Sequence, residues 1–190
     1  EELFKLAAIQ LSGQLEIEAD LLSEVRDFVV ERLRHYYREQ GYAAELINAA
    51  IATNFDTLPD LDRRLKAIAQ FMDQEEAQSL AAANKRIGNI LRKAGEASIT
   101  KIDEDRLLLA QERHLFDEVT RLGQEVSPLL KGGDYLSGLL LLAGLKTPVD
   151  AFFDSVMVMD EDPLLRANRL ALLNRLKSLF DQIADLSVLG

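Results

Sequence analysis

Four cations and one amide are spaced so that they share one face of a predicted helix, residues 74–94. At about 100° per residue, Lys85, Arg86, Asn89, Arg92 and Lys93 fall within an arc of about 120° that contains no acidic residue. Cations arranged in this way can hold phosphate groups. The alternative is a solvated face whose cations suit the negative end of the helix dipole. Both interpretations stay open, although an acid-free basic face is unusual in a chain of net charge -10.

Arginine and tyrosine side chains gather in a second stretch, RLRHYYREQGY. Such side chains can stack on unpaired bases and hold phosphates. The competing interpretation is structural, because Glu31 lies three residues before Arg34 and can pair with it along a helix. One of the adjacent rings Tyr36 and Tyr37 must also face the core. Tyr37 and Arg38 are the RNA-binding candidates of this stretch, with both interpretations open.

A third group of cations, Arg63, Arg64 and Lys66, lies at the start of a short predicted helix. Cations in this position oppose the helix dipole, which suggests that they are kept for a partner. The neighbouring Asp60 and Asp62 partly neutralise them. This group is therefore a weak candidate for an RNA contact.

No arrangement of residues typical of catalysis is present in the sequence. The two histidines, His35 and His114, lie in no metal-binding pattern, and the chain has neither a glycine-rich phosphate loop nor a nucleophile elbow. The acidic run at residues 160–162 is too short for a calcium loop and is followed by proline, so a helix cap explains it better. We expect no catalytic residue, cofactor or metal in this chain.

Composition favours a folded helical protein. Of the 190 residues 48% are apolar, and Trp does not occur. Cys is also absent, which excludes disulfides and thiolate metal sites and suits a reducing cytoplasm.

No apolar run reaches the length of a membrane span, so no membrane contact is expected; the longest candidate is 139–145. The net charge of -10 argues against non-specific binding of nucleic acid. Because residue 1 is not Met, we expect a piece of a longer protein.

Apolar residues at steps of three and four predict helices joined by short loops, and no strand. The predicted helices span residues 1–11, 19–40, 43–53, 61–72, 74–94, 104–124, 135–145, 147–155 and 163–186. The predicted N-terminal caps are Asp60, Asp73, Asp103, Asp134 and Asp162. A short turn or helix is predicted to start at Ser127-Pro128, and an extended segment at 156–159.

These elements predict an all-α fold in two parts. Residues 1–72 form an N-terminal helical part, which is either separate from or continuous with a bundle at 73–190. In the 74–94 helix, Asn84 lies at the edge of the apolar face and needs a hydrogen-bond partner, and Gly88 indicates close approach of another backbone.

The last predicted helix carries the strongest bundle signal. After Leu172 its apolar residues follow at steps of 4, 3, 4 and 3, which is typical of a packed helical seam. Arg166 and Arg169 lie one turn apart at its start and are expected to pair with the acidic turn before it. The full seam is Leu165, Leu172, Leu176, Leu179, Ile183 and Leu186.

Three strings in this chain also resemble a known family. The C-terminal string FFDSVMVMDEDPLLRANRLALLNRLKSLFDQIADLSVL is similar to the end of the β subunit of bacterial two-subunit glycyl-tRNA synthetases, and AANKRIGNILRKA and RDFVVERLRHYYREQGY resemble regions upstream of it. This portion is similar to the DALR-type anticodon-binding helical bundle shared with arginyl-tRNA synthetase. The DALR pattern is matched by Asp162, Leu165, Arg166 and the Arg-Leu-Ala-Leu run at 169–172, while Pro163-Leu164 departs from it.

The resemblance implies a role in holding tRNA(Gly) by its anticodon arm, with no catalysis in this portion. In that family the α subunit activates glycine with ATP and Mg²⁺, so the implied partners are tRNA(Gly), the α subunit and the remainder of the β subunit. Two function classes stay open. One is an RNA-binding module, favoured by the charge distribution; the other is a structural bundle that docks within the synthetase, favoured by the net charge.

Overall fold

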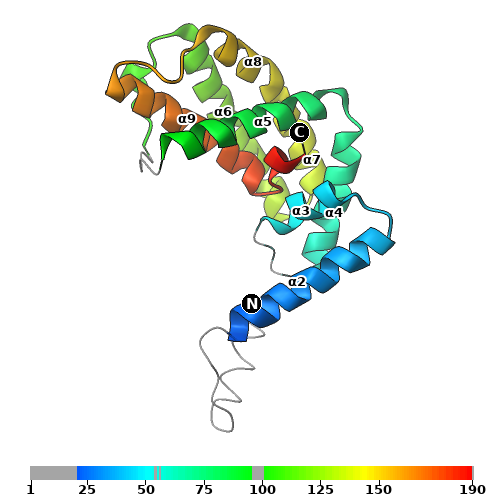
Figure 1. The fold of residues 1–190 in the computed structure, drawn as a ribbon. Helices are drawn as coiled ribbons and strands as arrows, with labels where there is room; N and C mark the ends of the chain where they lie inside the picture. The colour runs from blue at the N-terminus through cyan, green and yellow to red at the C-terminus, as the bar shows by residue number, and fades with distance from the viewer. Residues whose placement is uncertain (1–20, 54, 56, 96–100, 190) are drawn as a thin grey trace. The chain divides into compact units, whose positions relative to one another are not determined.

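The computed structural model describes residues 21–53, 55, 57–95 and 101–189, and within these ranges the secondary structure is helical without strands. The all-α prediction is therefore confirmed (Figure 1). The helix predicted at residues 1–11 lies outside the described residues. The chain divides into two compact units, residues 1–47 and 48–190.

The described part of the first unit begins with α2, Leu21–Glu39, and includes the start of α3, Ala44–Ile51. Gly41 ends the turn after α2 with φ +91, a conformation that favours glycine, and so stops the helix at the predicted boundary near residue 40. The backbone N–H groups of Gly41 and Tyr42 donate to the carbonyls of Arg38 and Tyr37, which closes the end of α2.

Helix α4, Leu58–Met72, begins three residues earlier than predicted. Thr57 is its N-cap and its hydroxyl accepts from the Asp60 N–H at 3.3 Å, so the prediction that Asp60 caps the helix is wrong. Pro59 fits the first turn because its missing N–H would have no intrahelical partner there. Asp60 is thereby placed inside the first turn, where its carboxylate is buried.

Helix α5, Glu75–Ala94, follows after a two-residue turn. Asp73 ends α4, and Gln74 precedes α5 without a side-chain cap, so the cap predicted at Asp73 is wrong. Glu75 and Glu76 supply the acidic first turn instead, at the positive end of the helix dipole.

The segment after residue 100 contains a 3-10 turn, η1, Glu104–Arg106, and then α6, Ala110–Lys131. Asp103 caps η1 and not a long helix as predicted. Glu112 accepts a hydrogen bond from the Leu109 N–H at 2.8 Å and so fixes the later start of α6. The prediction that a new short turn or helix starts at Ser127-Pro128 is also wrong, because α6 continues through these residues. Pro128 lies inside α6, where its fixed φ is compatible with a helical last turn.

Next come α7, Tyr135–Leu142, the 3-10 turn η2, Ala143–Leu145, and α8, Lys146–Ser155. Asp134 caps α7 as predicted, accepting from the Ser137 N–H at 3.2 Å. By length and composition alone, the described residues contain one stretch apolar enough to cross a membrane, 135–155, which exceeds the predicted run of 139–145. This stretch is divided among α7, η2 and α8, and each of these elements contributes side chains to the core.

Helix α9, Pro163–Asp181, begins at the predicted cap, where the Asp162 carboxylate accepts from the Leu164 N–H at 2.8 Å. It ends five residues before the predicted boundary and is followed by a 3-10 turn, η3, Leu186–Val188. The seam nevertheless continues past the helix end, because Ile183 and Leu186 are fully buried.

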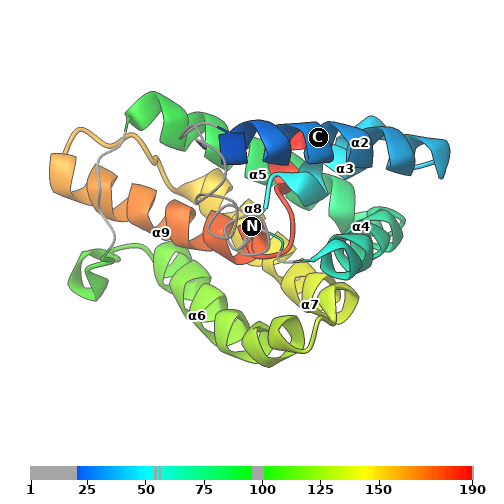
Figure 2. The ribbon, with the colours of Figure 1, turned by 90° about the horizontal axis from the view of Figure 1, so that it is seen from below.

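In the second unit α6 packs against α7, α8 and α9, while α4 packs on α7 and α5 on α9 and η3 (Figure 2). Gly138 allows the close approach of α7 to α6, since a Cβ there would lie 2.9 Å from Leu130 Cδ2. The core is aliphatic, as the composition suggests, and its largest fully buried side chains include Phe71, Phe152, Phe180, Leu80, Ile87, Leu115 and Leu122. The structure groups α4 with the residues that follow it, and the domain boundary after Met72 stays a prediction.

Candidate nucleic-acid interface

Helix α5 positions the predicted basic face by burying its opposite side. Ala77, Leu80, Ala81, Asn84 and Ile87 are all buried. They are packed by α9, η3 and α8, which cover this side of the helix. Because the buried positions recur at helical spacing, the residues between them are directed outward.

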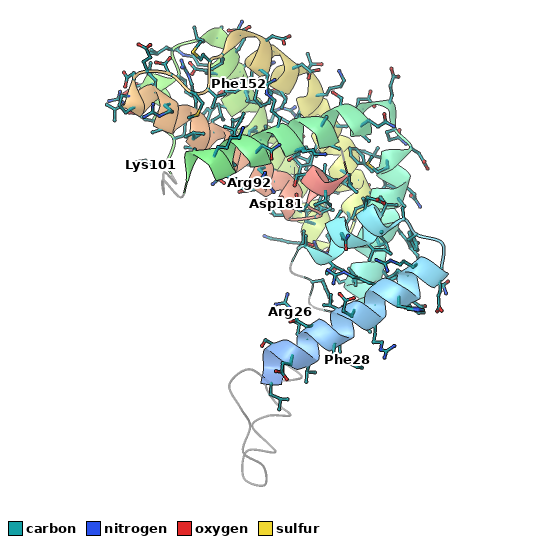
Figure 3. The ribbon with its side chains drawn as sticks, in the orientation of Figure 1. Arg26, Phe28, Arg92, Lys101, Phe152 and Asp181 are labelled. Atoms are coloured by element: carbon teal, nitrogen blue, oxygen red, sulfur yellow. The ribbon has the colours of Figure 1, made fainter. Side chains whose placement is uncertain are left out.

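The residues predicted to form the basic face lie on the outer side of α5. Around them the surface is hollowed into a shallow, open depression. Arg92 marks the face in Figure 3. The depression is lined by Ala82, Lys85, Arg86, Asn89, Ile90 and Lys93. The structure therefore brings Lys85, Arg86, Asn89 and Lys93 together, with Arg92 one turn of helix away from Asn89.

Two of the four cations of this face are held by contacts other than ion pairs among the described residues. Arg92 donates to the Asn89 side-chain oxygen, and the Arg86 guanidinium lies 4.0 Å from the centroid of the Phe153 ring. Within the described residues, Arg86, Arg92 and Lys93 make no ion pair. Cations without carboxylate partners keep their positive field for a ligand. No local pattern predicts Phe153 here, because it reaches α5 from the separate helix α8.

Asn84 and Gly88 of α5, for which the sequence predicts particular contacts, have different surroundings. Asn84 is buried and its amide donates to the Leu80 carbonyl at 3.0 Å, so the predicted need for a partner is met on the donor side. A Cβ on Gly88 would lie 3.8 Å from Lys177 Cε and 3.9 Å from Ser187 Cβ, which is ordinary contact. The close backbone approach predicted at Gly88 is therefore absent among the described residues.

In the first unit, α2 places the two adjacent tyrosines differently. The Tyr37 ring is 4% exposed and packs edge-on against Tyr36 and Tyr42, whereas Tyr36 is 53% exposed. Arg38 is exposed, and Arg34 pairs with Glu31 as expected. A contact of Tyr37 and Arg38 with RNA stays a prediction, and the burial of Tyr37 leaves Tyr36 as the more open ring.

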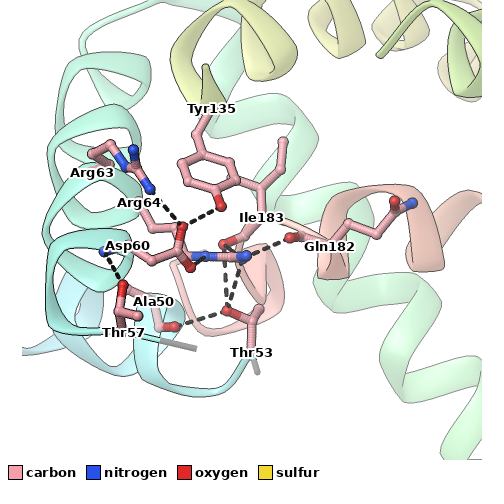
Figure 4. Close-up of polar contacts among 9 residues, drawn as sticks. All are labelled: Ala50, Thr53, Thr57, Asp60, Arg63, Arg64, Tyr135, Gln182 and Ile183. Carbon is pink, nitrogen blue, oxygen red and sulfur yellow. Dashed lines mark hydrogen bonds and ion pairs between the residues drawn. The ribbon is translucent and has the colours of Figure 1, made fainter. Parts of the chain in front are cut away.

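The cations at the start of α4 make contacts within the protein. The Arg64 guanidinium is buried and donates to the Asp60 carboxylate at 2.8 Å and to the carbonyls of Gln182 and Ile183 at 2.6 and 3.1 Å (Figure 4). Thr53 also accepts from Arg64, at 3.3 Å. Arg64 thus joins the start of α4 to the carbonyls that follow α9, and its burial keeps it from acting as an RNA contact.

Tyr135 completes this buried network, whereas Arg63 and Lys66 are exposed. Arg63 lies 3.5 Å from the Asp60 carboxylate, which also accepts from the Tyr135 hydroxyl at 2.5 Å; Lys66 pairs with Asp62 at 2.7 Å. Burial favours a raised pKa for Asp60. The hydrogen bonds from Tyr135 and Arg64 and the nearby positive charges outweigh it, so the pKa lies below the ordinary 3.8. Burial and the bond to Asp60 raise the pKa of Tyr135.

The acidic turn before α9 holds arginines, as predicted. Arg166 donates to the Asp160 carbonyl at 3.1 Å, and Arg169 pairs with the Asp160 carboxylate at 2.6 Å. Arg169 also pairs with the fully buried Glu112 of α6, a contact that no local pattern indicates. The described residues contain no group of His, Cys, Asp and Glu that would suit a metal ion.

Comparison with known protein families gives a match over most of the second unit. Residues 80–190, which include most of α5 and all of α6 to α9, match the model of the DALR anticodon binding domain. The chain therefore belongs to the DALR anticodon-binding domain family.

Among curated proteins the chain is similar to glycine–tRNA ligase beta subunits. The protein of Haemophilus influenzae (strain Rd) is 44% identical over 189 residues, which cover 100% of this chain and 27% of the relative. That of Marinobacter nauticus is 47% identical over 173 residues, 90% of this chain and 25% of the relative. The chain thus spans about a quarter of the length of these relatives, and the predicted resemblance is confirmed.

Proposed function

We propose that this chain binds the anticodon arm of tRNA(Gly) as part of the β subunit of a glycine–tRNA ligase. The observation that carries the proposal is the outward-facing, acid-free basic face of α5, which lies within the residues matched by the anticodon-binding family. A phosphate backbone requires such a local concentration of cations, and it tolerates a negative net charge elsewhere on the chain.

In this proposal the cations and the polar side chains have different tasks. Lys85, Arg86, Arg92 and Lys93 contact phosphates. Asn89 lies between them on the same face, where its amide is suited to the edge of an unpaired base. Tyr37 and Arg38 of α2 are further base-contact candidates, and the exposed ring of Tyr36 is available for stacking next to them.

The chemistry of glycylation belongs, in this proposal, to the complete two-subunit enzyme. The α subunit activates glycine with ATP and Mg²⁺, and the remainder of the β subunit joins this chain to it. This chain then contributes tRNA recognition in the cytoplasm and no catalytic residue.

Charge reversal on α5 tests the RNA surface. Changing Lys85, Arg86, Arg92 and Lys93 to Glu is expected to weaken binding of tRNA(Gly) by at least about a hundredfold at low salt, since a phosphate that no cation neutralises keeps its counterions. Filter retention over a salt series measures both the affinity and the salt slope. Circular dichroism is expected to be unchanged, because the four side chains lie outside the buried side of α5.

A matched control separates the site from the overall charge. In one variant the four α5 cations are replaced by glutamine. In the other, glutamine replaces four cations on other elements: Lys66, Arg106, Arg121 and Lys131. Both variants lose the same formal charge, but only the α5 variant is expected to flatten the salt dependence. Equal losses in the two variants would contradict the proposal.

The alternative function is a bundle that docks within the synthetase without touching RNA, which the net charge of -10 favours. Binding of the chain to an anticodon stem-loop discriminates between the two functions. An isolated module makes few phosphate contacts, so weak binding is expected, but it must fall with salt. Binding that is absent at low salt would favour docking.

A further inference from the structure

A second surface lies at the end of the bundle where α9 begins. Both views show η1, the connection from α8 to α9 and the first turn of α9 at this end (Figures 1 and 2). Arg169 of α9 joins the connection from α8 to α9 to the start of α6. It donates to the Met157 carbonyl at 2.9 Å and pairs with Glu112, whose other carboxylate oxygen accepts from the Leu109 N–H.

The connection from α8 to α9 exposes two methionines. Val156 is extended, and both Val156 and Val158 are buried. Side chains along extended backbone point to alternate sides, so Met157 and Met159 face outward, 71% and 52% exposed. Burial of the valines thus fixes the outward direction of the methionines.

Two leucines add to the apolar surface at this end. Leu108, between η1 and α6, is 58% exposed, and Leu164, in the first turn of α9, is 56% exposed. We name the four side chains Leu108, Met157, Met159 and Leu164 the α9-end patch. Large apolar side chains gathered at one end of a bundle are typical of a surface that is covered by a partner.

Carboxylates accompany the α9-end patch, and two of the four nearby arginines are paired with carboxylates, while Arg113 and Arg166 donate to the carbonyls of Leu107 and Asp160. Glu104, Asp105 and Glu161 are exposed and make no ion pair with the described residues. Arg106 pairs with Asp103, and Arg169 is buried between two carboxylates. The patch therefore lies in a negative field, opposite in sign to the basic face of α5.

We propose that the α9-end patch docks a cationic amphipathic helix of a protein partner. Its apolar side would cover the methionines and leucines, since flexible Met side chains adapt to such helices. Its Lys and Arg residues would face Glu104, Asp105 and Glu161, which gives the complementary charge. RNA is disfavoured because these carboxylates repel phosphates. The surface is separate from the RNA face proposed on α5 and does not depend on it.

Methionine oxidation reports on the occupant directly, because the chain contains three methionines and two of them belong to the patch. The probe is a synthetic helix with leucine on one face and lysine on the others. Peroxide oxidation is followed by mass spectrometry, with the half-buried Met72 as internal reference. Bound peptide is expected to slow oxidation of Met157 and Met159 relative to Met72. Unchanged relative rates would overturn the proposal.

Variants test both parts of the recognition. Changing Met157 and Leu164 to Ser, or Glu104, Asp105 and Glu161 to Lys, is expected to raise the peptide Kd about tenfold. Leu140→Ser, at an exposed apolar position of α7, is the matched control and is expected to leave the Kd unchanged. Equal Kd values in all variants would overturn the proposal.

Two further ligands separate this surface from other occupants. A peptide with glutamate in place of lysine is expected to bind at least about tenfold more weakly. Tight binding of that peptide, or protection of Met157 and Met159 by an anticodon stem-loop, would overturn the proposal. Loss of RNA binding in the α5 variants leaves this test unaffected, so the two proposals fail independently.

Discussion

Helices α4 and α5 both carry clustered cations, but the fold uses the two clusters in opposite ways. In α4, Arg64 is 8% exposed and is bonded to a carboxylate, a hydroxyl and two backbone carbonyls. In α5, Arg92 is exposed and bonded to an amide on its own helix. The first cluster stabilises the bundle, and the second is left accessible to a ligand.

The difference follows from the residues one turn away along each helix. Asp60 precedes Arg64 by four residues and Asp62 precedes Lys66 by four, the spacing at which opposite charges meet on a helix. In α5 the positions three and four residues before each cation hold no acid. They are Ala81, Ala82, Ala83, Gly88, Asn89 and Ile90. A cluster of cations therefore indicates a ligand only where the neighbouring turns lack carboxylates.

The largest expected effect in this comparison is the loss of Arg64. Arg64→Ala leaves the Asp60 carboxylate and the carbonyls of Gln182 and Ile183 buried without their donor. We expect the free energy of unfolding to fall by about 3–5 kcal/mol, as is typical when one partner of a buried ion pair is removed. Urea denaturation followed by circular dichroism measures it.

Arg63→Ala is the control for this experiment, because Arg63 lies beside the same carboxylate but its side chain is 55% exposed. An exposed pair contributes little, so a loss below about 1 kcal/mol is expected. Losses of equal size at the two positions would remove the distinction between a buried and an exposed cation in α4.

A smaller effect is expected from acid, through Asp60. Its pKa is lowered in the folded protein, so below the ordinary 3.8 the unfolded chain takes up the proton first. The stability that Asp60 contributes is therefore complete above pH 3.8 and is lost as the pH falls through the lowered pKa. The difference in unfolding free energy between the wild type and Asp60→Asn is expected to be about 1–3 kcal/mol at pH 7.

Denaturation of both proteins between pH 2 and 7 measures that difference, which is expected to shrink toward the acid end. Subtracting the variant removes the contribution of the other carboxylates that titrate in this range. A difference that stays constant with pH would mean that Asp60 stabilises α4 through packing and not through its charge.

Local features of the sequence predict much of this structure. The cap at Asp162, the stop at Gly41 and the pairing of Arg169 with the acidic turn depend on residues within a few positions of one another. The outward direction of the α5 cations likewise follows from helical periodicity alone. Such features depend on interactions between residues close in the sequence, so their prediction succeeds.

The remaining features depend on residues far apart in the sequence. Glu112 and Arg169 are separated by 57 positions, and Arg64 and Gln182 by 118. The sequence leaves open which of Tyr36 and Tyr37 is buried, since both positions border the apolar side of α2. The cap predicted for α4 is wrong because Thr57 and Asp60 are both good caps, and Pro59 in the first turn selects the earlier one.

The smallest expected effect concerns Gly88, within α5 itself. If α5 makes no tight packing contact at Gly88 and serves to present its outward-facing cations, an added methyl group at Gly88 is tolerated. Its Cβ would meet Lys177 and Ser187 at ordinary distances, and alanine favours the helix. Gly88→Ala is therefore expected to raise the free energy of unfolding by about 0.5–1 kcal/mol and to leave tRNA(Gly) binding unchanged.

Gly138→Ala in α7 is the matched substitution, with the opposite sign. Its Cβ would lie 2.9 Å from Leu130 Cδ2 and 3.2 Å from Val126 Cγ2, so these side chains must move, at a cost of about 1–3 kcal/mol. Thermal and urea unfolding of both variants distinguish the two sites. Destabilisation by Gly88→Ala would show that α5 is held by close packing at Gly88. That result would contradict the view that α5 exposes its cations without close packing at Gly88.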